Sequence, residues 1–489
     1  MSTIGTPIAD DVTAGFEMVV GLEVHVQLKT ASKAFDGASA DYGAPPNANT
    51  EPLCLALPGT LPVLNARAVE LAVRAALALD CTVHGTSIFA RKHYFYPDLP
   101  KGYQISQHDR PLATDGRLHI GAHADGTPAW VGITRVHMEE DAGKSIHDRY
   151  PGVTAVDLNR CGVPLIEIVS EPDMRSPEEA GAYLRTLKQV LEYLDVSDCN
   201  MEEGSLRVDA NVSARRPGAP LGTKCEVKNM NSFSGVERAL ATEFRRQCEL
   251  LAAGGTVQQQ TLLWDGAKGE VRPARSKEGS SDYRYFPEPD LPPLVISADE
   301  LARHRAALPE LPAARKARYA AMGLGDYDVQ ELTADPVTGP WFERLAAAHG
   351  DAKAAANWVT GEVRASLKER GTTIDAFALA PERLATLLDL VRDGTVSSTA
   401  ARTVYARLLE SGDDARVIAE RDGLLQVRDD DALARWVDEV LAENPAEAQR
   451  YLGGEKKLQG VLVGLVMKKS QGRADPRRIN QLLSTRASG

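Results

Sequence analysis

The chain has 489 residues, of which 43% are hydrophobic and 25% charged. These are ordinary values for a globular protein of roughly two to four domains. No apolar run approaches the roughly 20 residues that a membrane-spanning helix needs, and the first residues lack the features of a signal peptide. The six cysteines are scattered without a Cys-x-x-Cys pair, which argues against a disulfide framework or a zinc site made of thiolates alone. We therefore expect a protein of the reducing cytoplasm that does not associate with membranes.

The charge of the chain is unevenly distributed. The net charge of −12 argues against general nucleic-acid binding. However, residues 413–450 contain 11 acidic and 5 basic side chains, whereas residues 451–489 contain 8 basic and 2 acidic ones. A basic end on an acidic protein can bind a polyanion locally, but the same pattern is typical of a solvated helical tail. Composition leaves both interpretations open.

We expect residues 1–16 to form a frayed tail. After them, segments that alternate between apolar and polar residues predict half-buried strands. In residues 18–28 the apolar positions 22, 24 and 26 alternate with Glu23, His25 and Gln27. The alternation recurs in residues 205–214 and 224–230, and residues 164–170 form a more apolar strand that carries Glu167. These segments favour a β-rich domain.

Three helices are predicted among these strands, over residues 66–79, 176–194 and 236–252. The second has the clearest start, because Ser176 suits the N-cap, Pro177 the first helical position and Glu179 the third. After the Pro-rich residues 288–294, Ala, Leu, Arg and Glu dominate at helical spacing, with a further change near Asp413. The sequence therefore indicates an α+β fold class with a helical second half.

The segment VHMEEDAGKS, residues 136–145, combines three acids with a Gly-Lys-Ser. A nucleotide-binding P-loop needs a glycine five positions before Gly143, and this chain has Met138 there. An ordinary NTPase loop is therefore disfavoured, although Lys144 and Ser145 can still contact an anion.

The acids of the first domain suggest a metal site. Glu23 and His25 share one face of a predicted strand, roughly 7 Å apart. Further acids lie on or next to strands: Glu139, Glu140, Glu167, Glu202, Glu203 and Asp209. If they line a cleft, like charges cannot all stay ionised without a cation, and Mg²⁺ binds such oxygen-rich sites. His25 is a less usual neighbour of Mg²⁺ and can be a ligand, a support for ligands or a proton carrier. The alternative is that these acids face bulk solvent.

Several long segments resemble those of the GatB family, the B subunits of aspartyl/glutamyl-tRNA amidotransferases. These segments occur in the order GLEVHVQL, LPGTLPVLN, KHYFYPDLPKGYQISQ, VHMEEDAGKS, DLNRCGVPLIEIVSEPDMRSPEEA, MEEGSLRVDANVS, GTKCEVKNMNSF and SSDYRYFPEPDLPPL. The resemblance covers the chain from Glu17 onward.

The resemblance implies a mixed, largely antiparallel β-sheet cradle domain over residues 17–305. It further implies an all-α helical domain over residues 306–412 and a small YqeY-like helical tail over residues 413–489 that binds tRNA. The implied activity is ATP-dependent phosphorylation of the side-chain carboxylate of misacylated Glu-tRNA(Gln) or Asp-tRNA(Asn), followed by amidation with ammonia. The implied partners are a glutamine-hydrolysing amidase, which is the A subunit of the complex and supplies the ammonia, a small C subunit and the misacylated tRNA.

The family's roles, transferred to matching positions, imply specific site residues. Glu23, His25, Glu140 and Glu167 are expected to be catalytic residues around Mg²⁺, with Glu139, Glu203 and Asp209 as neighbours of the ion. Lys144 and Ser145 are expected to contact the phosphates of ATP. The basic residues expected to contact tRNA are Lys456, Lys457, Lys468, Lys469, Arg477 and Arg478.

The chain departs from part of the family in residues 32–59. Many relatives carry four zinc-binding cysteines there, but three of those positions are Asp36, Ala38 and Glu51 in this chain, and only Cys54 remains. We therefore expect packing rather than zinc to hold this loop. The segments of a glutaminase are also missing, so we expect no ammonia production by this chain alone. A catalytically inactive tRNA-binding scaffold is the alternative function, and the intact set of acids favours the enzyme.

Overall fold

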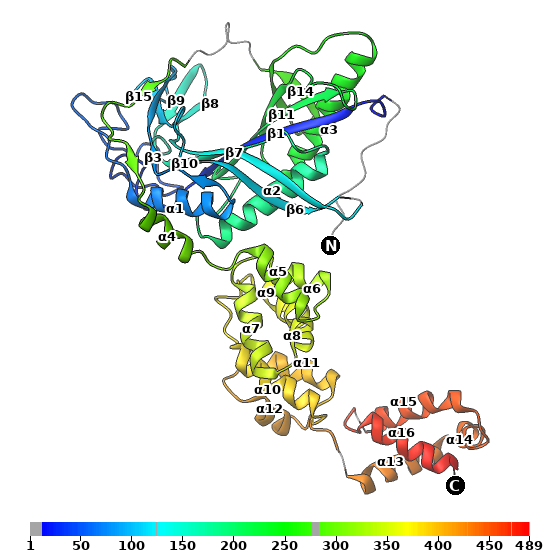
Figure 1. Cartoon of the computed structure of the whole chain (residues 1–489). Coiled ribbons are helices and arrows are strands. Elements are labelled where there is room, and N and C mark those ends of the chain that lie inside the picture. Colours follow the sequence, from blue (N-terminus) through cyan, green and yellow to red (C-terminus); the bar gives the residue numbers. More distant parts are fainter. Residues whose placement is uncertain (1–11, 124, 275–282, 428, 471, 489) are drawn as a thin grey trace. The chain divides into compact units, whose positions relative to one another are not determined.

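The computed structural model describes residues 12–123, 125–274, 283–427, 429–470 and 472–488 (Figure 1). Residues 1–11 of the expected N-terminal tail lie outside this range. The chain divides into two compact units, Met1–Ala314 and Arg315–Gly489. Among the described residues, no helix is long and apolar enough to cross a membrane.

A nine-stranded sheet organises the first unit. All neighbouring strands are antiparallel except the parallel pair β12–β13, which confirms the mixed, largely antiparallel sheet. In spatial order the strands are β14 (Glu270–Pro273), β13 (Thr261–Asp265), β12 (Cys225–Met230), β11 (Leu206–Arg215), β1 (Glu17–Gln27), β10 (Pro164–Ser170), β7 (Pro128–Glu140), β6 (Ala113–Ala122) and β2 (Thr82–Val83).

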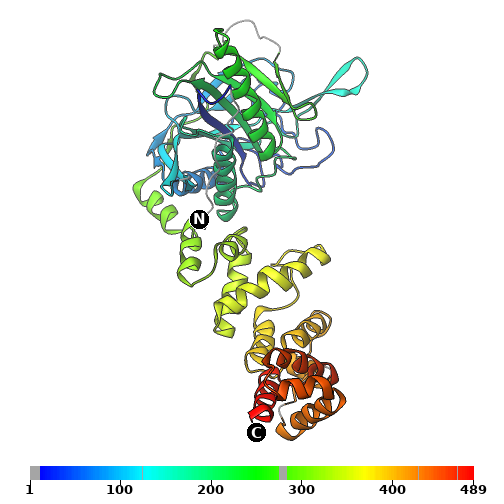
Figure 2. The same cartoon turned by 90° about the vertical axis from the view of Figure 1, so that its right-hand side faces the viewer.

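In the part of the chain that the structure describes, the remaining strands form three small sheets. The first contains β15 (Phe286–Pro287), β4 (Ala90–His93) and β5 (Tyr103–Ser106), and the second contains β16 (Leu294–Val295) and β3 (Thr86–Ser87). The third is the hairpin of β8 (Lys144–Tyr150) and β9 (Val153–Asp157), which extends away from the large sheet (Figure 2).

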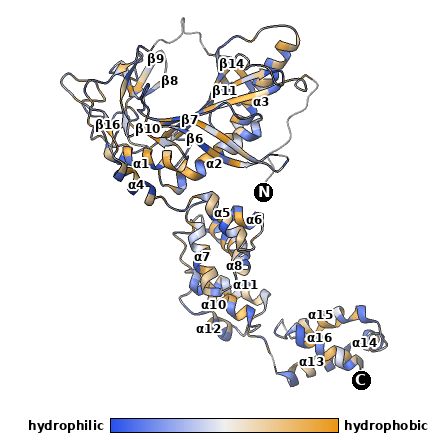
Figure 3. Cartoon of the chain, viewed as in Figure 1, coloured by the Kyte–Doolittle hydropathy of each residue, from blue (hydrophilic) through white to orange (hydrophobic). Residues whose placement is uncertain are grey.

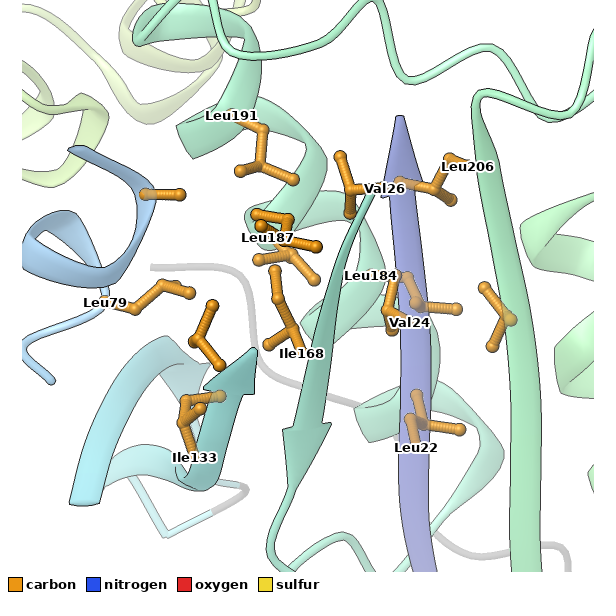
Figure 4. Close-up of a cluster of buried hydrophobic side chains, with 14 of the residues drawn as sticks. Leu22, Val24, Val26, Leu79, Ile133, Ile168, Leu184, Leu187, Leu191 and Leu206 are labelled. Carbon is orange, nitrogen blue, oxygen red and sulfur yellow. The ribbon is translucent and has the colours of Figure 1, made fainter. Parts of the chain in front are cut away.

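The large sheet has one apolar face, which is covered by helices. Leu22, Val24 and Val26 of β1 are buried with Ile168 of β10, and Leu187 of α2 packs against them (Figure 4). The helices of this unit are α1 (Ala66–Ala78), α2 (Pro177–Tyr193), α3 (Phe233–Ala252) and α4 (Ala298–Ala306). Orange and blue stripes along α1 and α2 show the amphipathic character that this packing requires (Figure 3). The opposite face of the sheet is left to polar side chains.

The predicted start of α2 is confirmed. The Ser176 hydroxyl accepts a hydrogen bond from the Glu179 amide at 3.1 Å, and Pro177 occupies the first turn. The Glu179 carboxylate accepts a hydrogen bond from the Arg175 amide at 2.6 Å. These bonds satisfy amide groups that have no partner within the helix.

A β-bulge in β7 sets which side chains face the polar side of the sheet. Val169 pairs with Arg135, but the next residue of β10, Ser170, pairs with Ile133, so Thr134 is an extra residue in β7. Ile133 and Val136 are both buried in the core as a result. Alternation from Val136 onward then places His137 and Glu139 on the polar face.

The second unit is helical. The division between the units falls within the first turn of α5. The helices are α5 (Pro312–Ala321), α6 (Asp326–Leu332), α7 (Thr338–His349), α8 (Ala352–Trp358), the π-helical turn Val359–Val363, α9 (Arg364–Arg370), α10 (Pro381–Arg392), α11 (Ser398–Leu408), α12 (Ala415–Arg421), α13 (Asp430–Glu443), α14 (Pro445–Leu452), the 3-10 turn Lys456–Leu458, α15 (Gln459–Lys469) and α16 (Pro476–Ser488).

Two apolar clusters of described residues stabilise this unit. The first extends from Tyr319 to Ala419, and the second from Leu433 to Leu483. Helices after a β-rich unit confirm the α+β class, whereas the expected domain boundaries at 305/306 and 412/413 stay predictions.

We predict that Leu187→Ala lowers the stability of the first unit by about 2–5 kcal/mol, because it leaves a cavity between α2 and the sheet. Lys188→Ala on the same helix, at the partly exposed position beside it, should change stability by less than about 0.5 kcal/mol. Hydrogen exchange of β1 amides measures the loss, with α10 amides of the second unit as an unchanged reference. Equal protection of β1 in the two variants would contradict the assigned packing.

Candidate active site

Three central strands align polar side chains in one row on the open face of the sheet. His25 of β1 lies opposite Glu167 of β10, and Glu167 lies opposite His137 of β7. Glu139 follows His137 two residues later, so it projects from the same face. The row therefore contains two histidines and two carboxylates.

The four side chains form a closed ring of contacts, which we call the His–Glu ring. His25 Nε2 is 3.4 Å from Glu139 Oε1 and 3.4 Å from Glu167 Oε2. His137 Nε2 is 3.2 Å from Glu167 Oε2 and 3.8 Å from Glu139 Oε2. The His25 side chain is 20% exposed, whereas that of His137 is only 3% exposed, so solvent reaches the ring mainly from the His25 side.

The ring strongly perturbs the pKa values of its members. Burial lowers the pKa of His25, but its hydrogen bond to Glu167 and the charge of Glu139 outweigh burial and raise the value to about 9. Burial raises the pKa of Glu167, but hydrogen bonds from His137 and His25 outweigh this effect and hold the pKa well below its usual range. The pKa of Glu139 is also lowered, because the hydrogen bond from His137 and the charge of His25 outweigh burial. Both carboxylates are therefore ionised and are stabilised by positive charge.

His25, Glu139 and Glu167 fit a divalent metal ion. Each offers one ligand atom, and the three atoms lie within 4.8 Å of one another. Two carboxylates suit a hard ion such as Mg²⁺, and an imidazole is a common ligand of several other divalent ions. Two carboxylates buried side by side are costly without a cation, which makes this donor set a candidate metal site.

Glu23 and Asp209 lie on the same polar face but outside that group. Glu23 accepts a hydrogen bond from Asn211 Nδ2 at 3.0 Å, and burial and the charge of Glu167 raise its pKa. Asp209 lies opposite Glu23 and forms an ion pair with Lys228. The structure brings both acids near the ring, and their expected roles as metal ligands stay predictions.

The three consecutive acids of VHMEEDAGKS have three different sets of partners. Only Glu139 belongs to the His–Glu ring. Glu140 forms an ion pair with Lys101 and accepts a hydrogen bond from the Ile105 amide at 2.9 Å. Asp141 forms an ion pair with Arg207 at 2.8 Å. The structure thus does not place Glu140 with His25 and Glu167, because its partners are Lys101 and the Ile105 amide. The expected role of Glu140 as a metal ligand stays a prediction.

The Gly-Lys-Ser that follows has a packing explanation. A Cβ atom on Gly143 would lie 2.8 Å from the Asp157 carbonyl oxygen and 3.0 Å from that of Asp98. The Ser145 hydroxyl donates a hydrogen bond to Asp98 Oδ2 at 2.9 Å, and Lys144 is exposed at the start of β8. The expected phosphate contacts of Lys144 and Ser145 stay predictions, as does the role of Glu203, which is exposed in a turn before β11.

A buried lysine holds the loop of residues 32–59, where we expected packing rather than zinc. Lys33 is fully buried, and its ammonium donates hydrogen bonds to the carbonyl oxygens of Asn49 at 2.6 Å and Leu158 at 3.4 Å. It also lies 3.2 Å from Cys54 Sγ, which is 2.9 Å from Asp36 Oδ2. These contacts account for the order of the loop, and the absence of zinc stays an expectation.

The basic residues of the tail differ in their surroundings. Lys469 is neutralised by Glu439 at 2.9 Å and Glu443 at 2.6 Å, and Arg478 forms an ion pair with Asp430. The others are exposed and have no ion pair among the described residues: Lys456, Lys457, Lys468 and Arg477. Their expected tRNA contacts stay predictions.

Sequence reasoning overlooked His137, Lys101 and Arg207. His137 stands two residues before Glu139, so in a strand both side chains project from the same face, and this signal is present in the sequence. Lys101 and Arg207 are recognisable only from the ion pairs they form with Glu140 and Asp141.

Comparison with known proteins decides the family. A model described as the GatB/GatE catalytic domain matches residues 18–302, and one described as a GatB domain matches residues 340–486. The chain belongs to the GatB/GatE family. The B subunit of the aspartyl/glutamyl-tRNA(Asn/Gln) amidotransferase of Chlorobium phaeobacteroides is 49% identical over 97% of this chain and 100% of its own length. The protein of the same name from Thermosynechococcus vestitus is 50% identical over 98% of this chain and 98% of its own length. That from Geobacter sulfurreducens is 50% identical over 97% of this chain and 100% of its own length.

This family membership confirms the resemblance that the sequence motifs indicated. The apolar sheet face and the His–Glu ring lie in the part of the chain matched by the GatB/GatE catalytic domain. The relatives are named as one subunit of an enzyme, which indicates a protein that works in a complex with other subunits.

We predict that Glu167→Gln lowers the affinity of the chain for Mn²⁺ by at least about tenfold, because a neutral amide replaces a ligand charge. Glu237→Gln is the control, since Glu237 forms an ion pair with Arg185 at 2.9 Å on helices that do not contribute to the ring. Calorimetric titration of Mn²⁺ into each variant measures the difference. Unchanged Mn²⁺ binding in Glu167→Gln would contradict the assigned site.

Proposed function

We propose that this chain uses ATP to activate the side-chain carboxylate of glutamate or aspartate misacylated on tRNA, for conversion to the amide. The observation that carries this proposal is the group His25, Glu139 and Glu167 on an open sheet face of a GatB-family chain. The names of the relatives, amidotransferases of aspartyl- and glutamyl-tRNA, support the substrate class. ATP and Mg²⁺ are the proposed cofactors, and the cytoplasm is the proposed location.

The first chemical step requires positioning rather than a general base. The side-chain carboxylate of the substrate has an ordinary pKa near 4.3, so it is already ionised at neutral pH. One of its oxygens forms a bond to the γ-phosphorus of ATP, and the bond from that phosphorus to the β–γ bridging oxygen breaks, which releases ADP. This chemistry explains why a site of acids and histidines, without a catalytic triad, suits the reaction.

His25, Glu139 and Glu167 would hold the divalent ion, which supplies positive charge against the negative charge of the triphosphate. His137 and the buried strands below it close the inner side of the site, since the His137 side chain is only 3% exposed. The more exposed His25 side is then where ATP and the aminoacyl end of the tRNA approach.

The second step joins nitrogen to the activated carbon. Ammonia attacks the carbonyl carbon of the acyl phosphate, the carbon–oxygen bond to phosphate breaks, and the nitrogen loses one proton to give the amide. Water would hydrolyse the same intermediate, so it must be excluded until ammonia arrives. Ammonium, which predominates at pH 7, has no lone pair for this attack, and a direct supply of ammonia is therefore required.

The amidase, or A, component of the complex is the proposed source of ammonia, and the small C component is its proposed third member. The naming of the relatives as one subunit of an amidotransferase supports an assembly of this kind. We further propose that exposed basic residues of the C-terminal tail contact phosphates of the tRNA.

We predict that Glu167→Gln abolishes phosphorylation of the aminoacyl carboxylate while tRNA affinity stays unchanged, since the ring lies far in sequence from the basic tail. The assay combines the chain with its amidase partner, ATP, Mg²⁺ and each misacylated tRNA, and measures ADP and amide. Glu237→Gln is again the control. Full ADP and amide formation by Glu167→Gln would instead favour a site elsewhere, and inactivity of the unchanged complex would favour the tRNA-binding scaffold.

We predict that the double substitution Lys456→Ser and Lys457→Ser weakens tRNA binding and flattens its salt dependence, lowering the slope of log affinity against log salt by roughly 1 to 2. Lys469→Ser should have a smaller effect, because Glu439 and Glu443 already neutralise that ammonium. Filter binding over a range of salt concentrations measures both slopes. An equal loss of tRNA affinity in the double variant and in Lys469→Ser would contradict the proposed tRNA contacts of Lys456 and Lys457. Unchanged tRNA affinity in the double variant would contradict them as well.

A further inference from the structure

His137 is the member of the His–Glu ring to which the sequence analysis assigned no role. Its side chain is 3% exposed, and Nδ1 is buried without a hydrogen-bond partner among the described residues. Nε2, in contrast, lies 3.2 Å from Glu167 Oε2 and 3.8 Å from Glu139 Oε2. Nε2 of this imidazole therefore has carboxylate acceptors beside it, whereas Nδ1 has none.

These surroundings fix the nitrogen that carries the proton. A buried N–H group without an acceptor is costly, so the neutral imidazole of His137 keeps its proton on Nε2, next to the two carboxylates. The imidazolium form carries a proton on Nε2 as well. In either form Nε2 is a donor and has no lone pair for a metal ion.

His25 differs from His137 in this respect. Its side chain is 20% exposed, so water is available to the second nitrogen, and Nε2 can present its lone pair to an ion when the ion displaces the proton shared with Glu167. Nε2 of His25 is also the imidazole nitrogen that lies 3.4 Å from Glu139 Oε1 and 3.4 Å from Glu167 Oε2, and these three residues form the group whose ligand atoms lie within 4.8 Å of one another.

We propose that His137 is a positioning residue, which donates its Nε2–H to Glu167 and holds that carboxylate in place for the divalent ion, while His25 is the imidazole ligand. This inference rests on the proposed metal site. Glu167 Oε2 lies between the two imidazoles, so the bond from His137 remains when the ion takes the place of the contact from His25. The β7–β10 register places His137 directly opposite Glu167, which makes the bond a consequence of the sheet itself.

The test compares two substitutions in the full-length chain, with Mn²⁺ as the probe. His137→Gln keeps an N–H donor at a similar reach, whereas His137→Leu removes it at similar volume. Donors that orient metal ligands typically contribute about 10- to 100-fold in affinity. We expect His137→Leu to lose Mn²⁺ affinity by this factor and His137→Gln to retain most of it, with both variants folded by circular dichroism.

Pulsed electron paramagnetic resonance of the bound Mn²⁺ supplies a readout that a merely structural role would not change. We expect coupling to one imidazole nitrogen, retained in His137→Gln and lost in His25→Ala. Coupling to two imidazoles, or its loss on substitution of His137, would overturn the inference by making His137 a ligand. Equal loss of affinity in His137→Gln and His137→Leu would also overturn it, because the N–H donor would then be irrelevant.

The outcome is distinguishable from failure of the proposed reaction. The Mn²⁺ measurements need neither ATP nor tRNA, so inactivity in the amide assay leaves them unaffected. Failure of the unchanged chain to bind Mn²⁺ would overturn the metal site and this inference together.

Discussion

Two carboxylates, Glu139 and Glu167, lie buried side by side on one face of a β-sheet, and their mutual repulsion is the constraint on which the site depends. Buried like charges remain ionised only next to compensating positive charge. His25 and His137 supply that charge through contacts of 3.2 to 3.8 Å. A divalent ion supplies it more strongly, and the chemistry proposed for this chain requires such an ion beside the triphosphate of ATP.

The apolar face of the same sheet is what keeps this arrangement in place. Leu22, Val24 and Ile168 are buried against α2, and they alternate with the residues of the ring. Because the side-chain period of a strand is two residues, a register slip of one residue would move the ring residues into the core. Burial of the apolar face therefore fixes the register that aligns His25, Glu167 and His137, so fold stability and site geometry have the same origin.

The alternation of the sequence predicted the strands that carry this candidate site and the side on which His25 lies, and the reasons for its gaps are physical. It placed Glu23 and His25 on one face of a strand, whereas Glu167 was noticeable only as the single acid of an apolar strand. Alternation assigned no side to Glu139 or Glu140, because adjacent residues face opposite sides and the extra residue Thr134 resets the alternation within β7. The preference for Glu140 over Glu139 as a ligand came from the resemblance alone.

Ion pairs formed by distant segments were beyond the reach of sequence patterns. Glu140 is held by Lys101, and Asp141 by Arg207, and no local pattern indicates either partner. Gly143 suggested a phosphate-binding loop, but its lack of a side chain is required by the close approach of Asp157 and Asp98. The helical second half followed from composition and spacing, whereas the division of its apolar residues into two clusters depends on tertiary packing.

The most direct test of this account is the position of Mn²⁺ in crystals of the full-length chain, measured by anomalous diffraction at the manganese edge. The account predicts a peak bounded by His25 Nε2 and by one oxygen each of Glu139 and Glu167, at coordination distances of about 2.0–2.3 Å. A peak at Glu140 and away from His25, or no peak on this face of the sheet at saturating Mn²⁺, would contradict it.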